Sequence, residues 1–187
     1  MTRVHMVRHG RAAAGWDVDP DPPLDELGRS QALTVAGRLA PRGPLHVVTS
    51  PLLRCQQTAF PLATAWKREV SIDPRVGEIP SPEGYALADR VTWLREVMAG
   101  TWTEAVASSG DRYGAYRQDI AACIAGLTAD TVVFSHFVAI NAVIGVATGD
   151  DRVLIASLDN CSVTTFDVND GVITLVEVGG EADTLIR

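Results

Sequence analysis

Long apolar runs are missing from this 187-residue chain, which argues against a membrane-spanning helix. The most apolar stretch, residues 137–147, is interrupted by Asn141 and is too short to cross a bilayer. The first residues are broken up by Arg3, His5 and Arg8, so they form no signal-peptide core. We therefore expect a cytoplasmic protein that does not associate with membranes.

Cysteine and net positive charge are also scarce. Cys55, Cys123 and Cys161 are odd in number and far apart, without metal-ligand spacing, which favours reduced thiols in a cytoplasmic protein over a disulfide or a metal site. The net charge of -7 gives no general attraction to nucleic acid or to an anionic membrane. An anionic substrate would therefore require a local basic pocket.

What is present is an alternation of strand-like and helix-like segments. Apolar residues make up 47% and charged residues 21%, as in an ordinary globular domain, so we expect one domain over residues 1–187. Strands are expected at 4–7, 46–50, 70–72 and 131–134, and helices at 25–40 (with Asp25 as N-cap), 52–66, 83–98, 112–127 and 138–148, with 100–107 as a connection.

The chain after residue 148 has a different pattern. Residues 163–168 and 172–178 alternate around Asn169-Asp170-Gly171, which is a hairpin turn signal. Together with the alternation before it, this predicts an α/β fold. We expect a three-layer α/β/α sandwich whose central sheet is mostly parallel and ends in a C-terminal antiparallel hairpin.

Chemically capable residues follow several of the predicted strands. Arg8 and His9 come directly after the first strand, and Gly10 allows a sharp turn there. Arg54 lies in the first turn of the helix after the second strand, where a helix N-terminus favours anions. Because the carboxyl ends of parallel strands line the ligand crevice of such folds, these side chains are expected to converge.

Two more candidates occupy similar places. His136 follows a strand predicted to be buried on both faces, and Glu78 lies in the loop after a short strand. Each residue has an ordinary interpretation too: Arg54 as a solvated helix residue, Glu78 as a surface carboxylate, and His136 as a core histidine with satisfied hydrogen bonds. Their shared position after strand ends favours a common site.

The Arg8-His9-Gly10 turn resembles the signature of the histidine phosphatase, or phosphoglycerate mutase-like, superfamily. Further segments resemble motifs of that family in the same order along most of the chain. They are residues 24–32 (LDELGRSQA) at the start of its first helix, 50–59 (SPLLRCQQTA) as its second motif, 77–79 (GEI) as its acidic loop, Ser135-His136 as its second histidine, and 160–164 (NCSVT) as the strand that follows.

The resemblance implies a role for each matched residue. His9 would be the nucleophile that becomes a phosphohistidine, while Arg8, Arg54 and His136 would hold the phosphate oxygens. Glu78 would protonate the leaving oxygen and then help to activate water. His9 must be neutral on its attacking nitrogen, so its other nitrogen should donate to a backbone carbonyl or a similar acceptor. No metal or cofactor is expected, because the arginines and histidine carry the charge.

Three further residues are assigned to substrate binding: Gly10, Arg11 and Phe137. Arg11 and Phe137 depart from the family pattern, as does Gly15, which stands where a phosphate-binding Asn is frequent. Arg11 either replaces a missing donor or faces solvent. Phe137, found where glycine is usual, either packs in the core or narrows the pocket.

The region of about residues 78–110 is expected to form a short helical lid. Its Tyr85, Trp93 and Trp102 either contact an apolar substrate group or pack between helices. The family's mutases use a longer insertion to keep water from the intermediate, so a short lid favours hydrolysis.

The sequence thus predicts a metal-independent phosphatase that hydrolyses a small phosphorylated substrate through His9. The alternatives are a phosphoglycerate mutase-type phosphotransferase and a phosphate- or phosphoprotein-binding module without turnover. Sugar phosphates, nucleotides, phosphohistidine proteins and small acid phosphates all stay open as substrates, and so does the oligomeric state.

Overall fold

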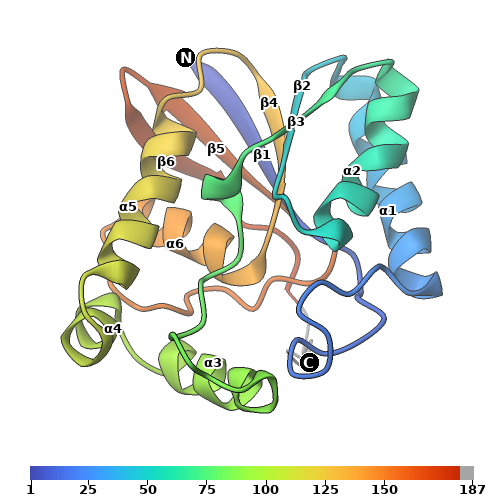
Figure 1. Cartoon of the computed structure of the whole chain (residues 1–187). Helices are drawn as coiled ribbons and strands as arrows, with labels where there is room; N and C mark the ends of the chain where they lie inside the picture. The colour runs from blue at the N-terminus through green and yellow to red at the C-terminus, as the bar shows by residue number, and fades with distance from the viewer. Residues whose placement is uncertain (182–187) are drawn as a thin grey trace.

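A six-stranded sheet runs through the centre of the computed structural model, which describes residues 1–181 (Figure 1). Its strands are β1 (Thr2–Arg8), β2 (His46–Thr49), β3 (Val70–Ile72), β4 (Thr131–Ser135), β5 (Val163–Asn169) and β6 (Val172–Glu177), in the order β3-β2-β4-β1-β5-β6. The first four in this order are parallel, whereas β5 and β6 form the antiparallel hairpin. The predicted α/β fold is confirmed.

Helices cover both faces of the sheet (Figure 1). On one face, α1 (Glu26–Leu39) and α2 (Leu53–Trp66) pack on alternate strand residues that include Val7 and Val132. On the other, α5 (Arg112–Ala125) and α6 (Phe137–Thr148) pack on their neighbours Met6 and Val133. Because side chains alternate across a strand, these two apolar clusters make the three layers.

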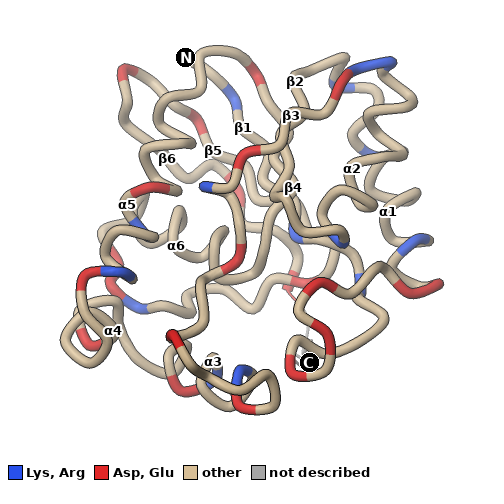
Figure 2. The backbone as a smooth tube through the Cα atoms, in the orientation of Figure 1, with Lys and Arg blue, Asp and Glu red and all other residues tan. Residues whose placement is uncertain are grey.

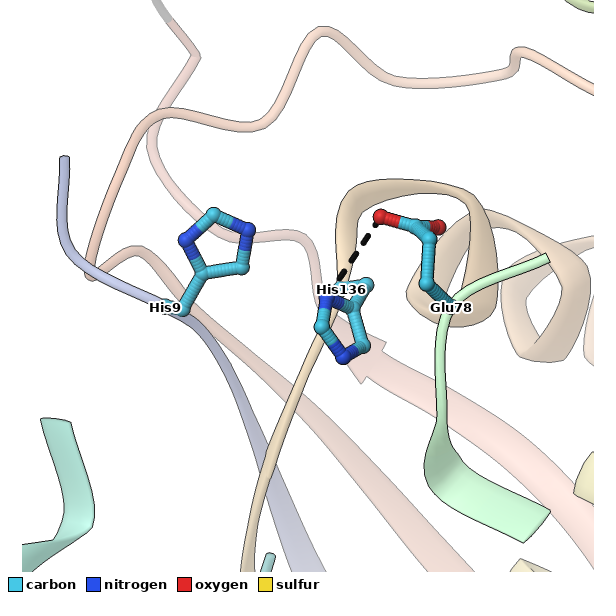
Figure 3. A group of neighbouring side chains, drawn as sticks. All are labelled: His9, Glu78 and His136. Atoms are coloured by element: carbon cyan, nitrogen blue, oxygen red, sulfur yellow. Dashed lines mark ion pairs between the residues drawn. The ribbon is translucent and has the colours of Figure 1, made fainter. Parts of the chain in front are cut away.

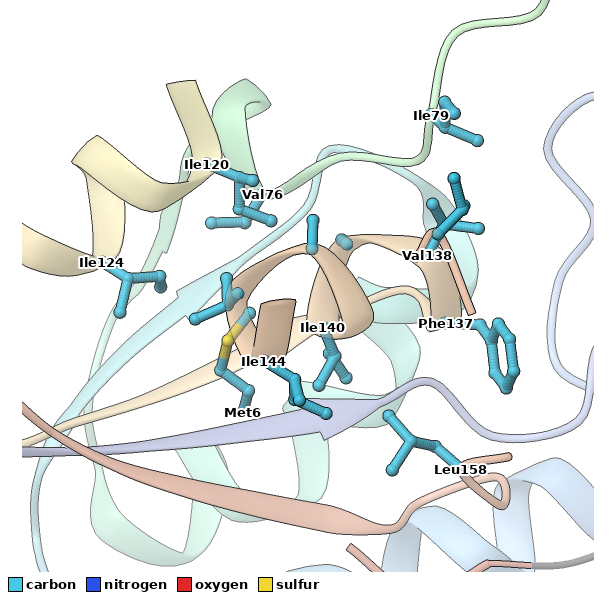
Figure 4. Packing of buried hydrophobic residues seen from close by; sticks show 14 of the residues in the cluster. Met6, Val76, Ile79, Ile120, Ile124, Phe137, Val138, Ile140, Ile144 and Leu158 are labelled. Carbon is cyan, nitrogen blue, oxygen red and sulfur yellow. The ribbon is translucent and has the colours of Figure 1, made fainter. Parts of the chain in front are cut away.

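Helix α6 is enclosed by the core, as Figure 4 shows for Ile140 and Ile144. Residues 137–145 are all buried, which explains why this helix has almost no polar face. Its one polar interruption, Asn141, donates to the carbonyls of Phe137 and Ala156 and accepts from Ile155 and Ala156. The buried amide is therefore fully bonded. Among the described residues, no helix has the length and apolar character that a membrane span requires.

The segment between β3 and α5 differs from the prediction. Only Arg90–Met98 of the helix expected at 83–98 is an α-helix (α3), since Gly84 has a positive φ of 76° and residues 87–89 form a 3₁₀ turn. The expected connection at 100–107 is wrong, because α4 (Trp102–Ser109) occupies it. Both α3 and α4 lie beyond the carboxyl ends of the parallel strands (Figure 1).

The remaining predicted elements are confirmed, with ends that shift by at most two residues. Asp25 caps α1 as expected, accepting from the Gly28 backbone N–H at 2.7 Å. Cys55, Cys123 and Cys161 are free and buried.

Candidate active site

The centre of the sheet brings the predicted site residues together. β1 and β4 are neighbours, with Arg8 opposite Ser135, and the His9 backbone N–H donates to the Ser135 carbonyl at 3.0 Å. On the other side of β4, the Ser50 N–H after β2 donates to the Phe134 carbonyl. Three strand ends therefore open into one pocket, which Arg8, His9, Arg54 and Glu78 line.

His9 is held in a single tautomer. Its Nδ1 lies 2.8 Å from the Gly10 carbonyl oxygen, which can only accept, so Nδ1 carries the proton. The lone pair is then on Nε2, where the Nε of Arg54 donates to it at 3.2 Å. Burial, together with the charges of Arg54 and Arg8, holds the pKa of His9 well below its ordinary value of 6.5. The expected backbone acceptor is therefore Gly10, and the unprotonated Nε2, which accepts from Arg54, is the candidate nucleophilic atom.

The turn that carries His9 is fixed from several sides. The Gly10 N–H donates to the Thr58 hydroxyl at 3.0 Å, and the Asn160 amide donates to the His9 carbonyl at 2.9 Å. A Cβ on Gly10 would lie 2.6 Å from the Gly28 carbonyl oxygen at the start of α1. Glycine is required here because the turn packs directly on that backbone.

Both arginines present buried donors to the pocket. Arg8 is 6% exposed, lies 4.9 Å from the centre of the Phe137 ring, and donates from Nη1 to the Leu158 carbonyl. Burial lowers its pKa to about 10, so it stays cationic at neutral pH. Within residues 1–181, Arg8 Nε and Arg54 Nη1 have no hydrogen-bond partner. Buried donors without partners are costly unless an anion satisfies them.

Glu78 and His136 complete the constellation, and Figure 3 shows both near His9. Glu78 Oε2 lies 3.4 Å from His136 Nδ1 and 3.7 Å from Arg54 Nη2. Burial raises the pKa of Glu78, although Arg54 opposes the shift. Burial and the Arg54 charge keep the pKa of His136 well below its ordinary value. The site thus holds neutral imidazoles beside a carboxyl whose pKa is raised by burial.

The ligand atoms of His9, Glu78 and His136 all lie within 4.8 Å of one another, close enough to share a metal ion. The charge of the pocket opposes a cation, because the Arg54 guanidinium already contacts all three side chains. The same charge favours a tetrahedral anion.

The substrate-binding predictions have mixed outcomes. Phe137 was expected either to pack in the core or to narrow the pocket. It is buried in the core and also lines the pocket. Arg11 does not reach the pocket: its guanidinium pairs with Asp25 at the start of α1. Trp93 and Trp102 are buried and stack near Tyr113 and Tyr116, so the packing interpretation is confirmed for these two.

Several residues of the site were not predicted. Ser50, whose hydroxyl lies 2.8 Å from His136 Nε2, directly follows β2, and the strand-end rule could have found it. Thr58 and Asn160 lie inside segments that resemble the family. Trp16 and Leu94 also line the pocket. Their positions depend on how the loop after β1 and helix α3 run in space, which no local sequence pattern indicates.

Comparison with known proteins agrees with this geometry. A family model described as histidine phosphatase superfamily (branch 1) matches residues 4–180. A relative named probable phosphoglycerate mutase GpmB from Serratia proteamaculans (strain 568) is 31% identical over 188 residues, covering 89% of this chain and 85% of the relative.

Two solved structures are similar in fold. The native mycobacterial glucosyl-3-phosphoglycerate phosphatase has a TM-score of 0.74 at 23% identity, covering 97% of this chain and 100% of that one. Bacillus stearothermophilus YhfR has a TM-score of 0.76 at 19% identity, covering 94% of this chain and 95% of that one.

Proposed function

The chain belongs to the histidine phosphatase superfamily, and from this premise we propose that it is a metal-independent phosphomonoesterase that works through a phosphohistidine on His9. The observation that carries the proposal is the state of His9: a neutral ring with an unprotonated Nε2, beside two buried guanidiniums. A nucleophile with its lone pair among cations suits attack on a phosphate dianion.

In the first step, His9 Nε2 attacks phosphorus and the bond to the leaving oxygen breaks. The electron pair goes to that oxygen, and Glu78 supplies its proton. Arg8 and Arg54 offset the charge of the transferring group, which is where their unpartnered donors would be used. The raised pKa of Glu78 supports its role as the acid.

In the second step, water attacks phosphorus and the N–P bond breaks. The electron pair returns to His9 Nε2, and the Glu78 carboxylate takes the proton from water. Phosphate leaves with the site in its starting protonation state. Dividing the hydrolysis in this way replaces one difficult displacement with two easier ones.

A phosphoglycerate mutase-type transferase is the second candidate, because relatives carry that name. The first step would be the same, but a substrate hydroxyl would replace water in the second. We also propose that the chain is one domain with a lid over about residues 78–110. The contribution of Leu94 from α3 to the pocket supports that lid.

The test is release of phosphate from an aryl phosphate in the presence of a chelator. Wild type should be active, and His9→Ala should lose ~10³-fold or more of kcat/KM, as expected for a lost nucleophile. The matched control is His46→Ala, an exposed histidine at the other end of the sheet, which should keep full activity. Phosphoglycerate isomerisation faster than phosphate release would favour the mutase. Phosphate binding without turnover would favour a binding module.

A further inference from the structure

Resting on the proposed phosphatase function, we propose that the site selects monoesters whose leaving group is a single uncharged, apolar alcohol. Substrates with a second acidic group near the phosphate, such as phosphoglycerates, would be poor. The inference comes from the apolar walls of the pocket and from the acidic loop beside it, residues 19–22, which we call the mouth. The proposed catalytic steps use neither of them.

The walls beyond the reacting groups are apolar. Ala14 and Trp16 come from the loop between β1 and α1, Leu94 from α3, and Phe137 and Val138 from the first turn of α6. Trp16 is half-buried, and the centre of its ring lies 6.4 Å from that of Trp93. An aromatic and aliphatic wall stabilises an apolar group and leaves hydroxyls or carboxylates without partners.

Both arginines that line the pocket bind the transferring phosphoryl group in the proposed mechanism, and their other donors contact protein groups. Arg54 contacts His9, His136 and Glu78, and Arg8 is bonded to the Leu158 carbonyl. No other Lys or Arg of the described chain lines the pocket. Arg90 stacks on the Trp16 ring at 5.3 Å but is not part of the lining. A second anionic group on the substrate would therefore meet no further cation among the described residues that line the pocket.

The mouth carries the opposite charge. Asp21 Oδ1 lies 3.9 Å from Arg54 Nη1, and Asp19 accepts from the Asp21 backbone N–H at 2.9 Å. The next residue, Pro22, lines the pocket. Figure 2 shows further acidic residues along this loop. The phosphate itself would be attracted by the buried guanidiniums, whereas a second anion held at the mouth would be repelled.

The experiment compares three esters of primary alcohols, so that the intrinsic reactivity of the leaving groups is similar. They are 2-phenylethyl phosphate, glycerol 1-phosphate and 3-phosphoglycerate. We expect kcat/KM for 2-phenylethyl phosphate to exceed that for glycerol phosphate by ~10-fold or more, the usual worth of an apolar pocket. The value for 3-phosphoglycerate should be lower still.

Variants test the two causes separately. Asp21→Asn removes the charge but keeps the acceptor for the Leu53 N–H. It should raise kcat/KM for 3-phosphoglycerate several-fold relative to kcat/KM for 2-phenylethyl phosphate. High salt should remove this difference between the variant and wild type. The control, Asp170→Asn, makes the same charge change in the β5–β6 turn at the opposite end of the sheet and should leave the ratio unchanged.

Trp16→Ala should lower the preference for the phenylethyl ester over glycerol phosphate. If this variant does not fold, Ala14→Lys adds a cation to the wall without removing packing and should raise the 3-phosphoglycerate ratio. Equal or better turnover of 3-phosphoglycerate by wild type would overturn the inference while His9-dependent hydrolysis still supported the phosphatase. Absence of His9-dependent turnover with all three esters would overturn both.

Discussion

At the scale of single residues, the chemistry depends on which His9 nitrogen is free. The sequence could predict that one nitrogen needs a backbone acceptor, because a nucleophilic imidazole must be neutral. It could not identify the Gly10 carbonyl as that acceptor, since the choice depends on the turn that Thr58 and Gly28 impose. The sequence also could not predict where the Arg11 side chain lies. Its guanidinium pairs with Asp25 and does not line the pocket.

Replacing Glu78 tests the proposed acid. Glu78→Gln keeps the shape but cannot give a proton, so kcat should fall by ~10²-fold or more for an alkyl phosphate, whose alkoxide leaves poorly. The loss should be much smaller for 4-nitrophenyl phosphate, whose phenolate leaves unaided. Initial rates with both esters measure this difference. Glu177→Gln, on the exposed edge strand, is the control. An equal loss with both esters would remove Glu78 from the protonation step.

The pH dependence of kcat/KM follows from the same two groups. His9 must be neutral, and its lowered pKa means that activity falls only when the pH drops well below 6.5. Glu78 must be protonated, and its raised pKa extends activity above the ordinary carboxyl range before it falls with rising pH. A profile of kcat/KM for an alkyl ester should therefore be bell-shaped. A rate that keeps rising into alkali would contradict this assignment.

At the scale of elements, the long periodic helices and strands were predicted, whereas the start of α3 was placed too early and α4 was missed. Each of these helices is only two to three turns long. A signal did exist for α4, because Thr101 and Glu104 have the spacing of a capping box and form both of its hydrogen bonds. Short helices depend on such caps more than on periodicity.

The cap of α4 gives a stability prediction. Thr101→Ala removes the side-chain acceptor of the Glu104 N–H and should lower the free energy of unfolding by about 1 kcal/mol. Thermal or urea unfolding measures the change, with the exposed Thr128→Ala as control. Activity at low temperature should be unaffected, as Thr101 does not line the site. A loss no greater than that of the control would show that the capping box is not stabilising.

At the scale of the whole molecule, the strand order creates the site. Placing β4 between β2 and β1 sets His136 beside both Arg8-His9 and Ser50, although these residues lie far apart in the chain. Alternation of strands and helices predicts a parallel sheet, but it does not give this order. The resemblance to a known family implied roles for these residues, but the strand order comes from the structure alone.

The buried titrating groups predict how global stability responds to acid. His5, His9 and His136 all have lowered pKa values in the folded state, so below about pH 6.5 the unfolded chain binds protons that the native state does not. Their contribution to stability is therefore lost as pH falls. Glu78 acts oppositely: its raised pKa gives stability that is present below 4.5 and lost as pH rises.

The three histidines lower stability on acidification, whereas the single carboxyl raises it. The free energy of unfolding should therefore fall as the pH is lowered from about 7.5 to about 5.5, by up to ~1.4 kcal/mol per pH unit for each histidine. Urea titrations across this range measure the slope. The dependence of unfolding free energy on pH should be steeper in Glu78→Gln than in wild type. It should be shallower in His5→Gln, which replaces a histidine that does not line the pocket. Stability that increases on acidification would contradict the buried, neutral histidines.

The most direct test of the central claim is to trap the covalent intermediate. Wild type mixed with an aryl phosphate and quenched in alkali, where phosphohistidine survives, should carry one phosphoryl group that peptide mass analysis places on His9. The group should be lost on acid treatment and absent from His9→Ala. The account would be contradicted by a phosphoryl group on another residue. It would also be contradicted if wild type turned over steadily with no phosphoryl group trapped while His9→Ala kept full turnover.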